Sequence, residues 1–316
     1  MKRAWDVVRS VLILHRVETL FFVAPLAAWG PVLACDAGRQ DARLCVLAIV
    51  LNVGTVLNGF LGNSYCDYEL DKRAPEKRRM TEATDLVGHA TVLAMFVTEM
   101  VFLGALFYSE RRLYASVAYS ELWFWFGMVG RYLYNFPPFR LKERGFLNVL
   151  SYAVNFGVTP FCLAWSMFYA VFPVGLILVA VAGFLLMASQ SLWGAAVDYD
   201  SDKGANAKTP AVVLGLRRSL RLSLYLMGLS VPLMVSGIYM LVSHNGLKAT
   251  PLVLGVAVVS SGFAYSIVGR VRYVVFSEDA LLQTRLQDKI RQLAWLVAQT
   301  GAGLAGLLVI TAARLW

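Results

Sequence analysis

The sequence predicts an all-α integral membrane protein, a single domain spanning residues 1–316 with nine transmembrane helices. Composition gives the first evidence, because 58% of the residues are hydrophobic and only 16% are charged, unlike a soluble domain. The second is the division of the apolar residues into stretches of roughly 20, the length that crosses a bilayer as a helix. The third is an uneven distribution of Lys and Arg among the connections.

The nine predicted spans are apolar stretches separated by more polar connections. They lie near 13–35, 44–62, 88–108, 114–131, 147–168, 172–196, 219–243, 250–269 and 292–313. The third-to-fourth and fifth-to-sixth connections are short, so these pairs of helices are expected to form hairpins. Asn155, Thr159 and Pro160 interrupt the fifth span, and Asn155 is a candidate cavity residue because polar side chains within membrane helices usually face the bundle interior.

The basic residues predict the orientation of the chain in the membrane. Of 29 Lys and Arg residues, 23 lie in the N-terminal tail, the even-numbered connections or the adjoining ends of spans (Arg16, Arg131 and Arg221), and the remaining six lie in the odd-numbered connections and the C-terminal tail. This bias places the N-terminus in the cytoplasm and the C-terminus on the opposite side. The net charge of +9 indicates topology, local phosphate binding and contact with anionic membrane lipids. No nucleic-acid partner is needed to explain it.

The four cysteines show no metal-ligand spacing. Cys35 and Cys45 flank the first outside connection, where they either form a disulfide in an oxidising compartment or remain unpaired. Cys66 and Cys162 are expected to be ordinary apolar or boundary residues.

Two acidic stretches follow the second and sixth spans and carry the strongest chemical signal. Asp67 and Asp71 in the first stretch, and Asp198 and Asp202 in the second, share the pattern Asp-Tyr-x-x-Asp-Lys-x-Ala-x-x-Lys. Aspartates four residues apart lie on one face of a helix, about 6 Å apart along its axis. Because like charges repel, a cation is expected between them, and oxygen ligands favour Mg²⁺.

Both acidic stretches are predicted to face the cytoplasm. The segments are separated by four spans, and an even number of crossings returns the chain to the same side. We therefore expect a cytoplasmic cap, formed by the connections 63–87, 132–146 and 197–218, in which the aspartates and nearby lysines surround Mg²⁺ and a polyphosphate. Asn63 shares a helix face with Asp67 and Asp71, so its oxygen could ligate the metal or orient an aspartate.

The basic residues of the cap have two possible roles, phosphate contact or membrane topology alone. Those nearest the aspartates are Lys72, Lys77, Lys203 and Lys208. The fourth span ends with a further group, Arg131, Tyr134, Arg140 and Lys142, around Pro137 and Pro138. The aromatic residues there could lie at the membrane interface or form the wall of a site.

These motifs resemble the UbiA superfamily of intramembrane prenyltransferases. Asn63-x-x-x-Asp67-x-x-x-Asp71 is similar to the first aspartate-rich motif of that family, and Asp198-x-x-x-Asp202 to the second. The segment from Tyr134 to Lys142 resembles the Tyr-Ser-x-Pro-Pro-x-Lys-Leu-Lys stretch of its chlorophyll-synthase-like branch. The chain departs from the pattern at Ser64, where many members have aspartate, and both Arg140 and Lys142 match the basic position of the family's Tyr-x-x-x-Lys pattern.

The resemblance implies a nine-helix bundle with a central cavity, and an isoprenoid diphosphate bound through two Mg²⁺ ions that it bridges. It implies that Asn63, Asp67, Asp71, Asp198 and Asp202 bind metal, and that the four aspartates and Lys142 are catalytic. The expected substrate-binding residues are Asn63, Lys72, Lys77, Arg131, Tyr134, Arg140, Asn155, Lys203 and Lys208.

The expected function is Mg²⁺-dependent transfer of a prenyl group to an aromatic or otherwise lipophilic acceptor, by ionisation of the diphosphate. One alternative is an intramembrane terpene cyclase, which would use the same ionisation and capture the cation internally. A cation transporter is a weaker alternative, because it requires acidic residues deep within the spans, whereas these aspartates lie at the cytoplasmic ends.

Overall fold

A computed structural model describes residues 2–17, 42–73, 77–204 and 206–244. All the elements named in these residues are helices, and the only β-type pairing among them is an isolated bridge between Arg144 and Lys208. The predicted spans 250–269 and 292–313 and most of 13–35 lie outside the described residues, as does Cys35 of the predicted disulfide. The all-α, multi-pass architecture is therefore confirmed, whereas the count of nine spans, the sidedness of the termini and the disulfide stay predictions.

The long helices among the described residues match the predicted spans to within a few residues, and shorter helices lie before and between them. They are α1 (Lys2–Leu14), α3 (Ala42–Cys66), α4 (Tyr68–Asp71), α5 (Arg78–Val87), α6 (His89–Ser109), α7 (Val117–Asn135), α8 (Phe146–Ala153), the π-helix η5 (Val154–Val158), α9 (Thr159–Phe168), α10 (Val174–Val197), α11 (Tyr199–Gly204), α12 (Pro210–Leu214) and α13 (Leu216–His244). Five segments are long and apolar enough to cross a membrane, namely α3, α6, α8 through α9, α10 and α13.

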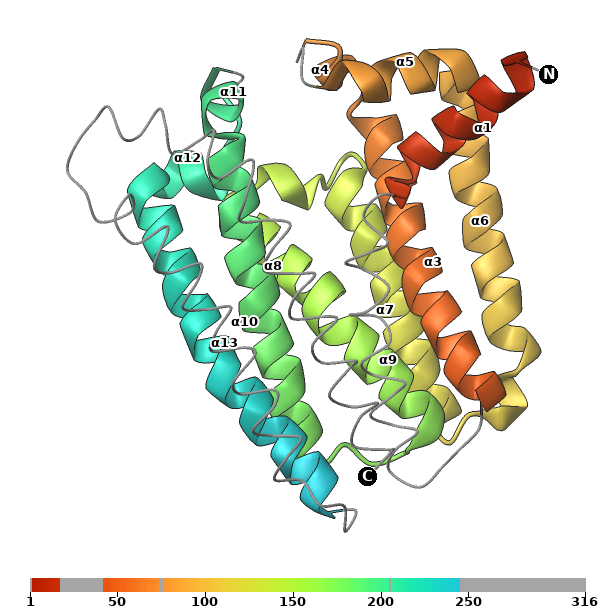
Figure 1. Cartoon of the computed structure of the whole chain (residues 1–316), viewed down its shortest axis with the longest axis vertical. Helices are drawn as coiled ribbons and strands as arrows, with labels where there is room; N and C mark the ends of the chain where they lie inside the picture. Colours follow the sequence, from red (N-terminus) through yellow and green to blue (C-terminus); the bar gives the residue numbers. More distant parts are fainter. Residues whose placement is uncertain (1, 18–41, 74–76, 205, 245–316) are drawn as a thin grey trace.

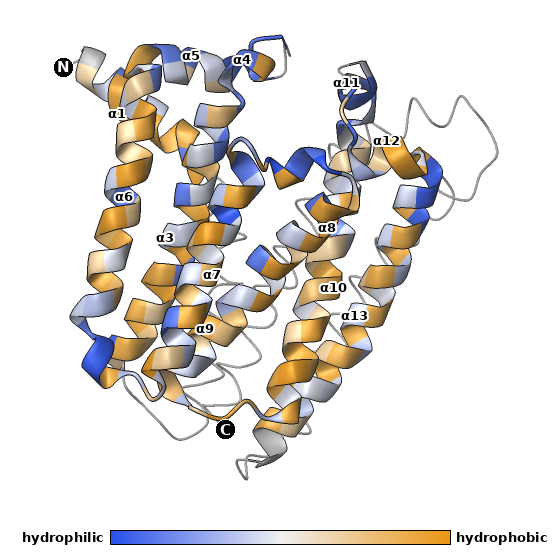
Figure 2. Cartoon of the chain, turned by 180° about the vertical axis from the view of Figure 1, so that it is seen from behind, coloured by the Kyte–Doolittle hydropathy of each residue, from blue (hydrophilic) through white to orange (hydrophobic). Residues whose placement is uncertain are grey.

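The long helices lie side by side, and the short ones gather at one end of the bundle (Figure 1). Elements α4 and α11, which carry the two aspartate motifs, lie at the same end, together with α5 and α12. Hydrophilic residues concentrate at this end, whereas α6, α10 and α13 are mostly hydrophobic along their length (Figure 2). The arrangement agrees with the even number of crossings expected between the motifs.

The main apolar core lies toward the opposite end, between α3, α6, α7, α9 and α10. Its centre is aromatic, since the rings of Phe107 and Phe124 are stacked with centroids 4.4 Å apart. Leu51, Phe168 and Leu176 are almost fully buried in the same cluster. This core holds the bundle together away from the polar end and leaves that end available for a site.

Helix α10 contacts its neighbours on two sides through glycine. A Cβ atom added to Gly157 of η5 would lie 2.3 Å from the carbonyl oxygen of Gly183 in α10. On the other side, a Cβ added to Gly237 of α13 would lie 2.6 Å from the carbonyl oxygen of Gly175. Small residues permit such close backbone approach between membrane helices, so the position of α10 is fixed from both sides.

The predicted interruption of the fifth span is a π-helix, η5, inserted between α8 and α9. Pro160 follows it and supplies no backbone N–H, which removes one hydrogen bond of a regular α-helix. The Thr159 hydroxyl donates to the carbonyl of Val154 at 3.0 Å, and the Asn52 amide donates to the carbonyl of Pro160 at 3.1 Å. Side chains thus replace backbone partners that the irregular segment lacks, as expected within a membrane.

Candidate active site

The first aspartate motif lies where α3 passes into α4. The N–H of Asp67 donates to the carbonyl of Asn63 at 3.0 Å, and the N–H of Asp71 donates to the carbonyl of Asp67 at 2.7 Å. The helical path therefore continues across Asp67, which stands between the two helices. Asp71 is buried at the end of α4, with the Lys77 ammonium 4.0 Å from its carboxylate.

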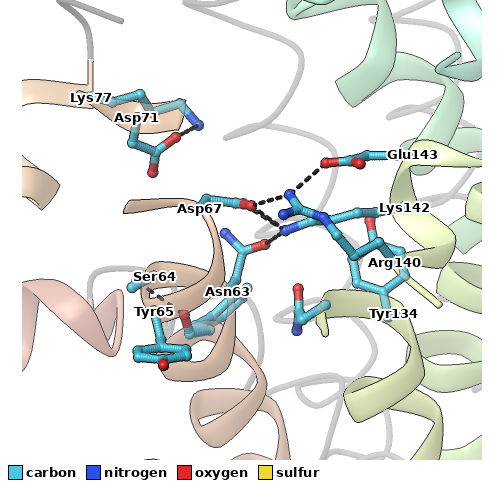
Figure 3. A network of polar contacts seen from close by, with 12 residues as sticks. Asn63, Ser64, Tyr65, Asp67, Asp71, Lys77, Tyr134, Arg140, Lys142 and Glu143 are labelled. Atoms are coloured by element: carbon cyan, nitrogen blue, oxygen red, sulfur yellow. Dashed lines mark hydrogen bonds and ion pairs between the residues drawn. The ribbon is translucent and has the colours of Figure 1, made fainter. Parts of the chain in front are cut away.

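The Lys142 ammonium is held by oxygens of the first motif (Figure 3). Its Nζ lies 2.6 Å from each carboxylate oxygen of Asp67 and 3.0 Å from the Oδ1 of Asn63. The Arg140 guanidinium donates to Asp67 at 3.0 Å and also pairs with Glu143 at 2.5 Å. Asn63, Asp67, Arg140 and Lys142 therefore form one network, whereas Asp71 and Lys77 form a separate pair beside it.

The connection between α7 and α8, residues 136–145, places these basic side chains through an unusual backbone path. Arg140 adopts a left-handed conformation with φ of 38°, which is strained for a residue other than glycine, and begins the short 3₁₀ helix η4 (Leu141–Glu143). Gly145 also has a positive φ, 55°, where a Cβ would be unfavourable, and its N–H donates to the carbonyl of Lys208 at 2.6 Å. This bond joins the α7–α8 connection to the segment that follows the second aspartate motif.

Asn148, at the start of α8, supports Lys142 from below. Its amide nitrogen donates to the carbonyl of Lys142 at 2.5 Å, and its oxygen accepts from the Ser191 hydroxyl at 2.9 Å. The Tyr134 hydroxyl lies 3.5 Å from the same oxygen. Helices α7, α8 and α10 therefore meet at one buried amide directly beneath the basic network.

The second aspartate motif continues from the end of α10 into α11. The N–H of Asp202 donates to the carbonyl of Asp198 at 2.9 Å, so these residues also follow each other by one helical turn. Burial raises the pKa of Asp202 to about 6, Asp198 and Glu143 add to the rise, and Lys77 opposes it. The charges of Lys77, which follows the first motif, and of Glu143 in the α7–α8 connection therefore act on the second motif, which indicates a shared electrostatic site.

Burial also affects the charged groups of the first motif. It raises the pKa of Asp71 above its ordinary value, while the positive charge of Lys77 opposes this rise. It lowers the pKa of Lys142, while the neighbouring Asp67 carboxylate opposes this fall. In both groups a nearby opposite charge counteracts the effect of burial on the pKa.

The donor set fits a magnesium ion completed by a substrate. Asn63 and Asp67 already direct three oxygens at a single positive centre, the Lys142 ammonium, at 2.6 to 3.0 Å. Among the described residues, no three His, Cys, Asp or Glu side chains converge into a closed metal cage. Magnesium commonly takes one or two carboxylates, water and substrate phosphates, so such an open site suits it.

A partly open cavity of about 360 Å³ lies between α7, the fifth span and the first half of α10, toward the end of the bundle opposite the aspartate motifs. Two of its lining residues, Ile177 and Val181, are exposed. None of its lining residues is charged, and they include Trp123, Cys162, Leu176, Ala180 and Phe184. Ala180 precedes Asp198 by 18 residues, which is five turns of a regular helix, so both lie on the same face of α10. The cavity therefore lies along the helix face that leads down from the second motif.

The other residues predicted for the site lie outside the Lys142 network. Lys72 lies 4.0 Å from the ring centroid of Tyr68 and pairs with Glu69, and Lys203 is exposed with Tyr199 nearby. Lys208 is exposed, and its backbone forms a bridge with Arg144 in the α7–α8 connection.

Arg131 and Asn155, also predicted for the site, meet each other within the bundle. The Arg131 guanidinium donates to the carbonyl of Asn155 at 3.3 Å and lies 5.3 Å from the ring centroid of Phe156. Both side chains are buried where α7 meets η5.

Sequence reasoning missed three residues that contact the site. Asn148 and Glu143 are the direct partners of Lys142 and Arg140, and a polar residue at the start of an apolar span was a usable signal for Asn148. His89 lies outside both motifs in the sequence, yet its ring stacks on Tyr65 and Tyr68, with centroids 4.2 and 4.8 Å away. The chain returns through α5 to bring His89 there, which spacing alone does not indicate.

The all-helical membrane bundle and the paired aspartate motifs at one end define an intramembrane prenyltransferase. The chain belongs to the UbiA prenyltransferase family, whose model matches residues 23–275.

Two similar proteins come from carotenoid metabolism. A lycopene elongase/hydratase of Corynebacterium glutamicum is 32% identical over 168 residues, which cover 52% of this chain and 55% of that protein. The C(50) beta-cyclic carotenoids biosynthesis protein LbtBC of Dietzia sp. is 28% identical over 166 residues, covering 50% of this chain and 35% of that protein. The matches thus span only about half of the first relative's length and about a third of the second's.

Solved structures share the fold over nearly the whole chain. A UbiA homologue from Archaeoglobus fulgidus bound to DMAPP and Mg²⁺ superposes with a TM-score of 0.69 at 18% identity, covering 97% of this chain and 98% of the other. The apo structure of a UbiA homologue from Aeropyrum pernix K1 gives a TM-score of 0.63 at 18% identity, with 94% and 97% covered. At this identity the likeness establishes the fold.

Proposed function

We propose that the protein transfers a prenyl group from an allylic isoprenoid diphosphate to a long apolar polyene within the membrane, in a Mg²⁺-dependent reaction. The observation that carries this proposal is the uncharged cavity below the aspartate motifs, on the same face of α10 as Asp198. Between Ala180 and Asp198 the helix rises about 27 Å, which is the length that a hydrocarbon would need to span to extend from the cap to the cavity.

The lining of that cavity suits a hydrocarbon chain, of the acceptor or of the donor, and offers no charged group to a phenol or carboxylate. A polar acceptor group would lose its hydration there without gaining a charged partner, which is unfavourable. The names of the two carotenoid-related relatives support a hydrocarbon acceptor of the lycopene type. The donor class is supported by the homologous structures bound to DMAPP and GPP with Mg²⁺.

Asn63, Asp67, Asp71, Asp198 and Asp202 would hold Mg²⁺, and we propose two ions bridged by the diphosphate. Bound Mg²⁺ neutralises the diphosphate and makes it a better leaving group. Arg140 and Lys142 can donate charge-assisted hydrogen bonds to the departing diphosphate, because both side chains reach the Asp67 carboxylate.

Bond changes then follow in order. The allylic carbon–oxygen bond breaks, and its electron pair leaves with the diphosphate. A double bond of the acceptor donates its electrons to the allylic cation and forms a new carbon–carbon bond. The resulting cation then loses a proton, for which the released diphosphate is an available base, or takes up water and releases a proton.

Aromatic side chains below the basic network can keep water from these cations. Tyr134 and Tyr152 have ring centroids 6.2 Å apart, and Tyr152 and Phe156 have centroids 4.6 Å apart. Such a row excludes water, and its π faces favour positive charge. The row starts beside Asn148, which also contacts the carbonyl of Lys142.

The test uses purified protein in nanodiscs with Mg²⁺, dimethylallyl, geranyl or geranylgeranyl diphosphate, and either lycopene or 4-hydroxybenzoate. We expect a prenylated lycopene by mass spectrometry, absent from Asp67→Asn and Asp198→Asn and present in Glu82→Gln, an exposed acid of α5 paired with Arg78. Prenylated hydroxybenzoate alone would contradict the polyene acceptor. Products formed without any acceptor would favour the terpene cyclase, and no diphosphate release would favour the cation transporter.

A further inference from the structure

Lys142 occupies the oxygens that the first metal ion would need. Its ammonium lies within 2.6 to 3.0 Å of both Asp67 carboxylate oxygens and the Asn63 amide oxygen. We infer that Lys142 is an internal counter-ion of the first metal site, which leaves Asp67 for the diphosphate when substrate binds and so makes metal binding there depend on substrate. The inference rests on the proposed function, because it assumes a diphosphate donor.

A metal ion and the Lys142 ammonium would compete for the same oxygens of Asn63 and Asp67. An ammonium and a magnesium ion cannot both lie between the same oxygens, since their charges repel at contact distance. Arg140 also donates to Asp67 at 3.0 Å, so two cations already neutralise this carboxylate. A metal ion arriving alone must displace at least Lys142 before it gains the Asp67 ligands.

The displaced ammonium needs another anion. The Lys142 side chain is only 12% exposed, and a buried charge without a partner is strongly unfavourable. The neighbouring acid, Glu143, already pairs with Arg140 at 2.5 Å. A diphosphate supplies the missing anion, because its oxygens can accept from Lys142 while its other oxygens complete the coordination of the metal.

Lys142 and Lys77 lie at different distances from the two aspartates of the first motif. The ammonium of Lys142 is within hydrogen-bonding distance of Asp67, whereas Lys77 lies 4.0 Å from Asp71. The Asn148 amide donates to the carbonyl of Lys142 at 2.5 Å and so fixes the backbone from which this side chain reaches Asp67. Coupling between metal and diphosphate is therefore expected at Asp67 in particular.

The experiment measures Mn²⁺ binding to the full-length protein in nanodiscs by electron paramagnetic resonance, without diphosphate. Lys142→Met and Lys142→Gln should each bind Mn²⁺ at least about fivefold more tightly than wild type, the lower end of typical coupling between sites. Adding Asp67→Asn to either variant should abolish the gain. Arg78→Met is the control, because it removes one positive charge from an exposed pair with Glu82 on the same side.

A second measurement follows retention of labelled inorganic pyrophosphate at saturating Mn²⁺. Both Lys142 variants should retain it at least about fivefold less well than wild type, while Arg78→Met should not change it. Unchanged Mn²⁺ affinity in both Lys142 variants, with weakened binding in Asp67→Asn, would overturn the inference and leave the proposed function intact. If Asp67→Asn changes Mn²⁺ affinity neither in the wild-type protein nor in the Lys142 variants, Asp67 is not a metal ligand. That result would contradict both the inference and the proposed mechanism.

Discussion

Replacing Asn148 with alanine tests whether the basic network depends on the amide beneath it. The Asn148 side chain joins the carbonyl of Lys142 at 2.5 Å to the hydroxyl of Ser191 at 2.9 Å. Alanine removes both partners at once and adds no new group. Lys142 donates to both carboxylate oxygens of Asp67. The substitution should therefore slow diphosphate release as well as lower the free energy of unfolding.

The magnitude follows from the two groups left behind. The carbonyl of Lys142 and the buried hydroxyl of Ser191 would each lose a partner, and an unsatisfied buried group costs about 1–3 kcal/mol. Two such groups give about 2–6 kcal/mol, and water entering the space left by Asn148 would bring the loss toward the lower end. A misplacement of about 1 Å at Lys142 would slow diphosphate release by roughly 10²-fold.

The assay combines thermal unfolding in detergent with single-turnover diphosphate release at saturating Mg²⁺ and donor. Ser151→Ala is the control, because the Ser151 hydroxyl donates only to carbonyls of its own helix and should change the free energy of unfolding by less than about 0.5 kcal/mol. An Asn148→Ala protein that is destabilised but releases diphosphate at the wild-type rate would refute the positioning role. One that keeps both properties would refute the hydrogen-bond argument as a whole.

Three further substitutions test other parts of the structure. Gly157→Ala places a methyl group 2.3 Å from the carbonyl oxygen of Gly183, so thermal unfolding should show a loss of about 1–3 kcal/mol or more. Gly194→Ala should be neutral or stabilising, because a Cβ there meets no atom of the described residues within 4 Å outside its own helix backbone. Ala180→Phe fills part of the cavity, so product analysis should show less prenylated acceptor while diphosphate release by water persists. His89→Ala removes two ring contacts and the 3.0 Å hydrogen bond to the carbonyl of Tyr65, and should lower stability by about 1–2 kcal/mol in the same unfolding assay.

The membrane helices were predictable because the bilayer imposes their length and their apolar composition. The interruption near Asn155 was also predictable, because Pro160 cannot supply a backbone N–H, although the sequence did not indicate that the irregular turn would be a π-helix. The bundle end shared by both motifs followed from counting crossings. These predictions depend on local composition and chain topology, which are properties of the sequence itself.

The contacts within the site were less predictable, because they join segments far apart in the chain. Arg140 and Lys142 both matched the basic position, and the structure brings both to Asp67. The two-residue spacing of Arg140 and Lys142 gave no indication of this, since a left-handed conformation at Arg140 redirects the chain. Likewise, the four-residue spacing of Asp67 and Asp71 did not reveal that each has its own lysine partner.

The glycine contacts on both sides of α10 have a consequence for motion during turnover. Backbone against backbone leaves no side chain that could change rotamer to let the helix slide, so α10 and the aspartates at its end should act as the stationary wall of the site. The first motif instead meets the α7–α8 connection through the long flexible side chains of Arg140 and Lys142. Any closing over a bound diphosphate should therefore come from the α4 and η4 side, with opening of that side setting the pace at which pyrophosphate leaves.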